Sequence, residues 1–519
     1  MKINKKLIKI KVLLLIIIHL IFLIISCSFI KEYDNVFIIY LDGANNLDQF
    51  ALNDFNEMKN LSSKYIEKLN NNSIILVLFD RMYNNIPSYN DWEDTRLYEI
   101  KYKDKGVSEV NEIDCPDLGL TTLYIDEDCD MGNAKTLARL CSFALNNYPA
   151  KRYFLDIWNH GGGWRKNKQM SDKEICSDEE SESVIKMIDI RNELNKISSL
   201  HFALIILDAC FMGTIEVAAN FIGLTDAIVF SQGPIPANGM PYDIIIPCIL
   251  SSENLRDIAK NICDEYVLYY TNLNENVTIS SCFVDYENRL DNFCKELVDE
   301  IMTFEFNEIR NKRENYLEFS QTCVDISVFT SISTKLQENL INLVLYNYPS
   351  TLSGLSIYFP KYPLYDKYWE DYKIEEVYFC SRYSKYINFL NNFSMTYISN
   401  IDTFEPNGKK ENSYNLSFPV NIESYIWCEN DLDYYKLLNI PVNEFKIRLL
   451  PPAGHDYDIK IYYYINDSLS IQQSTNSGDT EEEIIIDKDI ASKIEELYIV
   501  VVGAQSDFCQ DNSYNLIVQ

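Results

Sequence analysis

Histidine is scarce in this chain, and basic residues are far outnumbered by acidic ones. The 519 residues include four histidines, and 46 lysines and arginines stand against 77 aspartates and glutamates, for a formal net charge of −31. Such a charge argues against nucleic acid as a partner, because phosphate binding depends on lysine and arginine. It also argues against electrostatic docking onto anionic lipid. The scarcity of histidine shortens the search for a general base.

Three further absences narrow the chemistry. None of the 14 cysteines has the Cys-x-x-Cys spacing that is typical of zinc sites. The chain has no Gly-x-Ser-x-Gly turn, the nucleophile motif of α/β-hydrolases. The N-terminal apolar run, 12–25, is shorter than the roughly 20 residues that a membrane-spanning helix needs.

The N-terminus has the layout of a secretory signal. Five lysines precede the apolar run, which ends in Ile-Ile-Ser before Cys27. This ending resembles a bacterial lipoprotein cleavage box, so we predict a signal peptide at 1–26, lipidation of Cys27 and a tether at 27–35. Acyl chains would then hold the protein at a membrane of the cell envelope, facing the periplasm or exterior. A plain signal peptide or an uncleaved anchor is the alternative. Cleavage raises the net negative charge from 31 to 36, because it removes five lysines and no acidic residue.

Two apolar runs predict central strands of a parallel sheet. Residues 153–158 and 202–207 are almost continuously apolar instead of alternating, as expected for strands that are covered on both faces. Apolar residues recur at helical spacing in 134–147 and 212–221. The alternation of strand and helix predicts a doubly wound α/β sheet, in which ligands bind outside the carboxyl ends of the strands.

His160 and Cys210 come directly after these two strands, in Asn-His-Gly-Gly-Gly-Trp and Asp-Ala-Cys-Phe-Met-Gly. An imidazole beside a thiol is what a cysteine peptidase needs. His201 precedes its strand and should lie at the opposite edge of the sheet, and His455 should lie in another domain. The glycines after His160 let backbone N–H groups approach an oxyanion. Taken singly, a buried inert cysteine and a turn histidine are the simpler interpretations.

The order His then Cys, about 50 residues apart, is the order found in caspases. Together with further fragments, it makes the chain resemble the clostripain family of cysteine peptidases, whose clan also contains caspases, legumains and gingipains. The matching fragments lie at 36–47, 54–58, 130–133, 148–150, 159–164, 208–216, 239–242 and 354–360.

The resemblance implies a caspase-like fold, protein or peptide substrates, and chemistry without a cofactor. Cys210 would be the nucleophile, with its thiol pKa lowered by a cationic imidazole or a helix N-terminus. His160 would be the acid and base, and the N–H groups of Gly161 and Cys210 would bind the oxyanion.

Substrate preference should depend on the segment 231–243. Many relatives cleave after arginine or lysine, which needs a carboxylate at the base of the pocket. Asn238 occupies the place where an acid is expected, so Asp226 or Asp243 could substitute, or the specificity has changed.

The segment between the two strands predicts a surface loop. Its basic part, 165–168, is followed by a polar part that is acidic at 178–180. Either the loop is simply solvated, or it is a site of self-processing between His160 and Cys210. The acidic part could also bind Ca²⁺.

The resemblance to the clostripain family places the peptidase domain at 36–395, and short alternating strands predict an all-β sandwich at 402–519. The sandwich resembles the bacterial pre-peptidase C-terminal domain in residues 402–407, 431–435, 450–459 and 514–516. Its Ca²⁺ candidates, with solvent-facing acids as the alternative, are Asp431, Asp433, Asp456 and Asp458. Twelve cysteines besides Cys27 and Cys210 could pair in an oxidising compartment.

Two other functions stay open. A non-catalytic surface binding module could retain the same fold. An α/β-hydrolase esterase is the other, because His-Gly-Gly-Gly is also an oxyanion motif of lipases. The missing serine elbow argues against the esterase.

Overall fold

A computed structural model describes residues 31–519 apart from 63–71, 83–91, 103–107, 122–127, 166–174, 251, 317, 320–321, 367, 374–376 and 399–401. The chain divides into two compact units. The first comprises the chain up to Leu297 together with Leu317–Tyr358, and the second comprises Val298–Tyr316 and Phe359–Gln519. The predicted domain boundary between 395 and 402 falls inside the second unit and stays a prediction.

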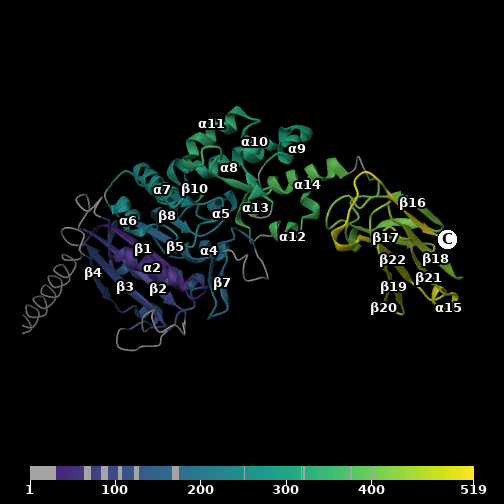
Figure 1. Cartoon of the computed structure of the whole chain (residues 1–519), viewed down its shortest axis with the longest axis horizontal. Coiled ribbons are helices and arrows are strands. Elements are labelled where there is room, and N and C mark those ends of the chain that lie inside the picture. The colour runs from purple at the N-terminus through teal and green to yellow at the C-terminus, as the bar shows by residue number, and fades with distance from the viewer. Residues whose placement is uncertain are drawn as a thin grey trace, which may run out of the picture. The chain divides into compact units, whose positions relative to one another are not determined.

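A nine-stranded sheet forms the centre of the first unit (Figure 1). Its order is β13-β10-β9-β8-β5-β1-β2-β3-β4. The five strands from β9 to β2 are parallel, and the strands outside them are antiparallel to their neighbours. The strands are β1 Tyr33–Gly43, β2 Ser73–Arg81, β3 Thr95–Tyr102, β4 Ser108–Glu112, β5 Ala150–Trp158, β8 Phe202–Asp208, β9 Thr225–Phe230, β10 Ile279–Phe283 and β13 Val344–Tyr348.

Helices cover this sheet in two groups. Helices α2, α6 and α7 pack against one another, as do α3, α4 and α5. Every residue of β2 is buried, which fits a strand that is covered on both faces. The helices of the first unit are α2 Asp48–Lys59, α3 Ala134–Asn147, α4 Met187–Leu194, α5 Ile215–Asn220, α6 Tyr242–Leu250, α7 Leu255–Asn272, α10 Ser327–Thr330 and α11 Thr334–Leu343, and α8 Arg289–Glu300 crosses into the second unit.

Two small sheets complete the first unit. The strands β11 Glu318–Phe319, β12 Cys323–Asp325 and β14 Ser356–Tyr358 form one, and the hairpin of β6 Ile175–Asp178 and β7 Ser183–Ile185 forms the other. The Ser356 amide donates to the Gly213 carbonyl at 2.9 Å, so β14 supports the loop that follows β8.

Two sheets that share one apolar core make up the C-terminal part of the second unit. Their orders are β15-β17-β22-β19-β20 and β16-β23-β18-β21, and Tyr435, Ile447 and Ile499 are among the buried core residues. The strands are β15 Tyr414–Ser417, β16 Val420–Ser424, β17 Leu432–Leu438, β18 Phe445–Leu450, β19 Tyr457–Ile465, β20 Ser468–Ser474, β21 Glu482–Ile486, β22 Glu496–Gly503 and β23 Tyr514–Val518. The helices of this unit are α9 Phe306–Glu314, α12 Trp369–Tyr372, α13 Tyr378–Arg382, α14 Lys385–Ile398 and α15 Lys488–Ala491.

The predicted fold class is confirmed: a doubly wound, mostly parallel α/β sheet followed by a β-sandwich. A solvated loop was one interpretation of the segment that begins at Arg165, and it is wrong for Arg165, which is buried, and for Asp178. Asp178 ends β6 and is fully buried, where its carboxylate accepts from the Met131 amide at 2.9 Å and from the Ser181 amide at 2.8 Å. Two backbone donors therefore take the place of water around this carboxylate.

The described cysteines form no disulfide, so the expectation that twelve cysteines could pair is wrong for this part of the chain. Twelve of the thirteen are buried as small apolar side chains, and Cys210 is half-buried. Within the described ranges, no helix is both long and apolar enough to cross a membrane. The predicted signal peptide, the tether at 27–30, Cys27 and the basic residues at 166 and 168 lie outside the described residues.

Candidate active site

The candidate site lies where the winding of the sheet changes direction. From β1 the chain proceeds to β2 on one side, whereas β5, β8 and β9 follow one another on the other side. The switch therefore falls between β1 and β5, and such switch points form crevices at the carboxyl ends of the strands. Trp158 at the end of β5 pairs with Asp208 at the end of β8, so the loops that carry His160 and Cys210 leave the sheet side by side.

Gly161 brings these two loops into contact. A methyl carbon added at Gly161 would lie 2.6 Å from the Cys210 carbonyl oxygen and 3.0 Å from the Cys210 amide nitrogen, so only glycine fits. His160 and Cys210 line one cavity of about 180 Å³, together with Trp158, Asp208, Ile235 and Gly239 among others. The pair predicted from the sequence is thus brought together in one pocket.

The Cys210 thiol is held by the backbone of the loop that follows β9. Its Sγ accepts from the Ile235 amide at 3.3 Å and lies 3.5 Å from the Ile235 carbonyl, to which it donates. Burial raises the pKa of Cys210, the Ile235 N–H partly offsets this, and the Asp208 carboxylate raises the pKa further. The predicted lowering of this pKa is therefore wrong. The next helix along the chain, α5, begins only at Ile215, so its N-terminus does not begin at Cys210.

His160 is positioned through both its backbone and its ring. Its backbone N–H donates to the side-chain oxygen of Asn159, whose amide nitrogen in turn donates to the Asp42 carbonyl at 2.9 Å. The ring atom Nε2 lies 2.7 Å from Oδ1 of Asn46, in the turn after β1. Sequence reasoning assigned no role to Asn46, which lies 114 residues from His160 and meets it only through the order of the strands.

Three buried carboxyl groups lie beneath this cavity, and Asp208 also lines it. Oδ2 of Asp208 accepts from the Met240 amide at 2.8 Å and from the Tyr242 hydroxyl at 3.2 Å, while its Oδ1 has no hydrogen-bond partner. The Tyr242 hydroxyl also lies 2.9 Å from Oδ2 of Asp156. Burial raises the pKa of Asp54, Asp156 and Asp208.

None of the three residues predicted for the specificity pocket lines this cavity, although Ala237 and Gly239, the neighbours of Asn238, do. Asn238 is exposed, Asp243 lies in the first turn of α6, and neither lines the cavity. The structure does not bring Asp226 to the site, because the second residue of β9 is at the amino end of a parallel strand. Its carboxylate is 3.1 Å from Nε2 of His201, which confirms that His201 lies at the opposite edge of the sheet.

Asp208 is the pocket carboxylate that sequence reasoning missed. Its position beside Cys210 was visible, but a strand-end aspartate is usually a turn residue. Gly239 is the residue in the sequence that could have indicated a close contact with Asp208. A methyl carbon there would lie 2.7 Å from Oδ2 of Asp208 and 2.9 Å from Nε1 of Trp158. This glycine, with a φ of +57°, allows the loop to close over the carboxylate.

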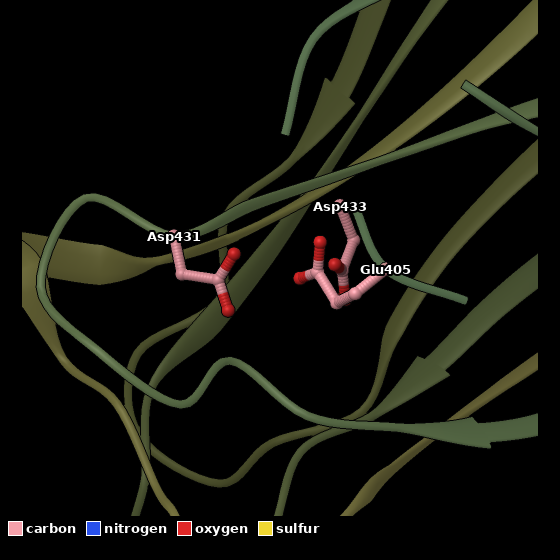
Figure 2. A group of neighbouring side chains, drawn as sticks. All are labelled: Glu405, Asp431 and Asp433. Carbon is pink, nitrogen blue, oxygen red and sulfur yellow. The ribbon is translucent and has the colours of Figure 1, made fainter. Parts of the chain in front are cut away.

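A separate group of acidic side chains lies in the second unit. Figure 2 shows the carboxyl groups of Glu405, Asp431 and Asp433 turned toward one another, and one oxygen of each lies within 4.8 Å of the chosen oxygens of the other two. Asp431 accepts from the Trp427 amide at 3.0 Å and Asp433 accepts from the Tyr514 hydroxyl, while Oδ1 of each has no hydrogen-bond partner. Of the four predicted Ca²⁺ ligands, Asp456 and Asp458 are not in this group.

Comparison with known proteins places the chain among cysteine peptidases. The clostripain family model matches residues 39–430. Clostripain from Hathewaya histolytica is 32% identical over 221 residues, a match that spans 40% of this chain and 40% of that protein.

Two solved structures show the same fold. A secreted C11 cysteine protease from Bacteroides thetaiotaomicron, in complex with an irreversible peptide inhibitor, aligns with a TM-score of 0.53 at 18% identity, over 67% of this chain and 98% of that one. An inactive zymogen of a C11 protease from Parabacteroides distasonis aligns with a TM-score of 0.51 at 21% identity and the same coverage.

Proposed function

The chain belongs to the clostripain family of cysteine peptidases, and from that membership we propose that it is an endopeptidase with Cys210 as nucleophile and His160 as general acid and base. One observation carries the proposal: both side chains line a single cavity at the carboxyl ends of two adjacent parallel strands. A binding module would not require this juxtaposition of thiol and imidazole.

Because burial raises the pKa of Cys210, we take the resting thiol as neutral, and this determines the order of events. His160 takes the thiol proton while Sγ bonds to the scissile carbonyl carbon, and the imidazolium then protonates the departing amine. A water molecule, deprotonated by His160, next attacks the thioester and releases the acid product and the thiol. The N–H groups of Gly161 and Cys210 are our candidates for the oxyanion donors, because the two residues are in backbone contact beside the cavity.

We assign the preference for arginine or lysine to Asp208. Asp208 lines the cavity, and its Oδ1 has no hydrogen-bond partner, so the cation of a substrate could bind there. The attraction between the two charges would then offset the cost of removing both from water. Asn238, Asp243 and Asp226 are less suited, since none of them lines the cavity.

The test of the proposal is hydrolysis of fluorogenic peptides under reducing conditions by the full chain, Cys210→Ala and His160→Ala. We expect turnover by the unaltered chain alone. Equal turnover by Cys210→Ala would disprove the assignment. No turnover by any of the three, across peptides that vary the residue before the bond and with and without calcium, would favour the surface binding module instead.

We also propose export with a lipid anchor at Cys27, and self-processing in the segment between His160 and Cys210. The supporting observations are the lysine-rich apolar N-terminus and the basic residues at 166 and 168. Arg165 is less suited, because it is buried and donates to the Gly162 carbonyl. Cys27→Ala should abolish incorporation of labelled fatty acid, and Cys210→Ala should abolish slow splitting of the purified chain. An unchanged result in either variant would refute the corresponding proposal.

The acidic group in the second unit fits a calcium ion. Ca²⁺ prefers oxygen ligands, and Asp431 and Asp433 are almost fully buried with one carboxylate oxygen each unpaired. We propose that Glu405, Asp431 and Asp433 hold Ca²⁺ and that this ion stabilises an accessory domain without taking part in the chemistry.

A further inference from the structure

We propose that Asn46 is a positioning residue for His160: its side-chain oxygen fixes the imidazole tautomer that can accept the thiol proton. The inference rests on the proposed function, since it concerns the same pair. The observation that carries it is the 2.7 Å separation between Oδ1 of Asn46 and Nε2 of His160.

Topology explains why an asparagine after β1 can reach this ring. The turn at 44–47 follows β1, and His160 follows β5, the parallel neighbour of β1. Leu41 pairs with Trp158, so the two chains leave the sheet at the same level on either side of the switch point. Asn46 and Cys210 are thus contributed by loops that follow different strands, with the loop of His160 between them.

The chemistry follows from the hydrogen-bonding capacity of the two groups. A carboxamide oxygen only accepts, so Nε2 of His160 must carry the hydrogen in this bond. In the neutral ring, Nδ1 then carries the lone pair and is the atom that receives the thiol proton. The bond strengthens once the ring is cationic, because a charged donor makes a stronger hydrogen bond.

Asn46 is not needed to hold its own turn. The turn is closed by Asn45, which is almost fully buried and whose Oδ1 accepts from the Leu47 amide at 2.8 Å. The amide nitrogen of Asn45 donates to the Ser177 carbonyl at 2.8 Å, which ties the turn to β6. The side chain of Asn46, on an exposed residue, is thereby left to contact the ring.

The other flank of the turn is fixed by a buried ion pair. Asp48, the first residue of α2, binds Arg81 through two bonds of 2.9 and 2.8 Å, and both side chains are at most 3% exposed. With Asn45 held on one side and Asp48 on the other, the backbone at Asn46 is pre-organised before substrate binds. A bidentate buried pair supplies this kind of geometric restraint.

The experiment compares kcat, KM and the pH profile of kcat/KM for the full chain, Asn46→Ala and Asn46→Asp. Asn46→Ala should lower kcat about 10- to 100-fold with little change in KM, a range typical of impaired proton transfer. Asn46→Asp restores an acceptor of the same shape and adds a negative charge, which raises the pKa of the His160 ring. The acidic limb of its pH profile should therefore move to higher pH, and kcat should exceed that of Asn46→Ala.

Asn195→Ala is the matched control, because this exposed asparagine only donates to the Arg191 carbonyl within its own helix end. Melting curves show which variants fold. If Asn46→Ala does not fold, Asn46→Asp tests the proposal by itself, through the position of the acidic limb of its pH profile. Activity that survives Cys210→Ala would overturn the catalytic pair itself. The role of Asn46 alone would be overturned by a different result. In that case Cys210→Ala is inactive, but both Asn46 variants match Asn195→Ala in kcat and in the position of the acidic limb of the pH profile.

Discussion

At the scale of single residues, the state of the Cys210 thiol decides how the enzyme works. Its contacts are with backbone groups of Ile235, and burial dominates its electrostatics. The structure therefore favours a neutral thiol that is activated by His160 over a resting thiolate–imidazolium pair.

Alkylation by iodoacetamide measures this state. Because burial raises the pKa of Cys210, the alkylation rate should be low at neutral pH and climb about tenfold per pH unit beyond the ordinary thiol range. Mass spectrometry of the modified peptide gives the rate. A plateau that is already reached at pH 6 would instead indicate a thiolate and contradict the proposed sequence of proton transfers.

At the same scale, we propose that Asp208 sets the preference for arginine or lysine before the scissile bond. Asp208→Asn removes the charge and keeps the shape, so kcat/KM for peptides with lysine or arginine before the bond should fall about 100-fold. Peptides with an apolar residue there should change less than about threefold. For the unaltered chain, the preference for basic residues should weaken as pH falls through the raised pKa of Asp208, because protonation removes the charge. Asp243→Asn is the control.

An equal loss on both classes of peptide would mean that Asp208 only supports the loop at Met240. The comparison with Asp243→Asn separates this from a general effect of lost charge, since Asp243 lies outside the cavity.

At the scale of elements, the loops after β5 and β8 are in backbone contact at Gly161 and Cys210, and we expect this contact to position the nucleophile. Gly161→Ala would press a methyl group onto the Cys210 backbone, and displacement of the nucleophile by about 1 Å should cost about 100-fold in kcat. Gly223→Ala is the control for backbone strain away from the site: its φ of +91° strains the turn before β9, but a methyl carbon there meets no atom within 4 Å. Peptide hydrolysis by the two variants gives the comparison. Equal kcat values would show that the contact at Gly161 is dispensable.

The elements themselves could largely be predicted from local patterns. The apolar runs at 153–158 and 202–207 lie within β5 and β8, and the helix predicted at 134–147 coincides with α3. These features depend on periodicity along a short stretch of chain.

The missed features depend on strand order instead. Asn46 reaches His160 because β1 and β5 are neighbours, and Asp208 lies beside Gly239, which follows a different strand. Asp178 is buried because its hairpin packs against the segment of Met131. No local pattern contains these contacts. The error over Cys210 has a similar origin, since its pKa depends on burial and on Ile235, 25 residues away.

At the scale of the whole molecule, the proposed calcium site of the second unit should link stability to pH and to calcium. Burial raises the pKa of Asp431 and Asp433 above 3.8, with the charges of Asp433 and Glu405, respectively, as the next cause. The folded state therefore binds more protons than the unfolded state. Without a cation, its stability should fall as pH rises from about 4 through these raised pKa values.

Calcium should reverse this loss at neutral pH and do little once the carboxyl groups are protonated. Calorimetry of the full chain with chelator and with Ca²⁺, at pH 5 and pH 7.5, measures both effects. Asp433→Asn should abolish the calcium-dependent rise in Tm, whereas Asp458→Asn, outside the group, should keep it. A Tm that ignores calcium at pH 7.5 would refute the site.

The most direct test of the catalytic assignment is covalent labelling by an irreversible peptidyl inhibitor that carries lysine at its reactive end, mapped by mass spectrometry on the native protein. The twelve other cysteines that the structure describes are buried, so the inhibitor should modify Cys210 alone. His160→Ala should slow this reaction sharply. Labelling of another cysteine, or equal labelling in His160→Ala, would contradict the assignment of Cys210 and His160 as the catalytic pair.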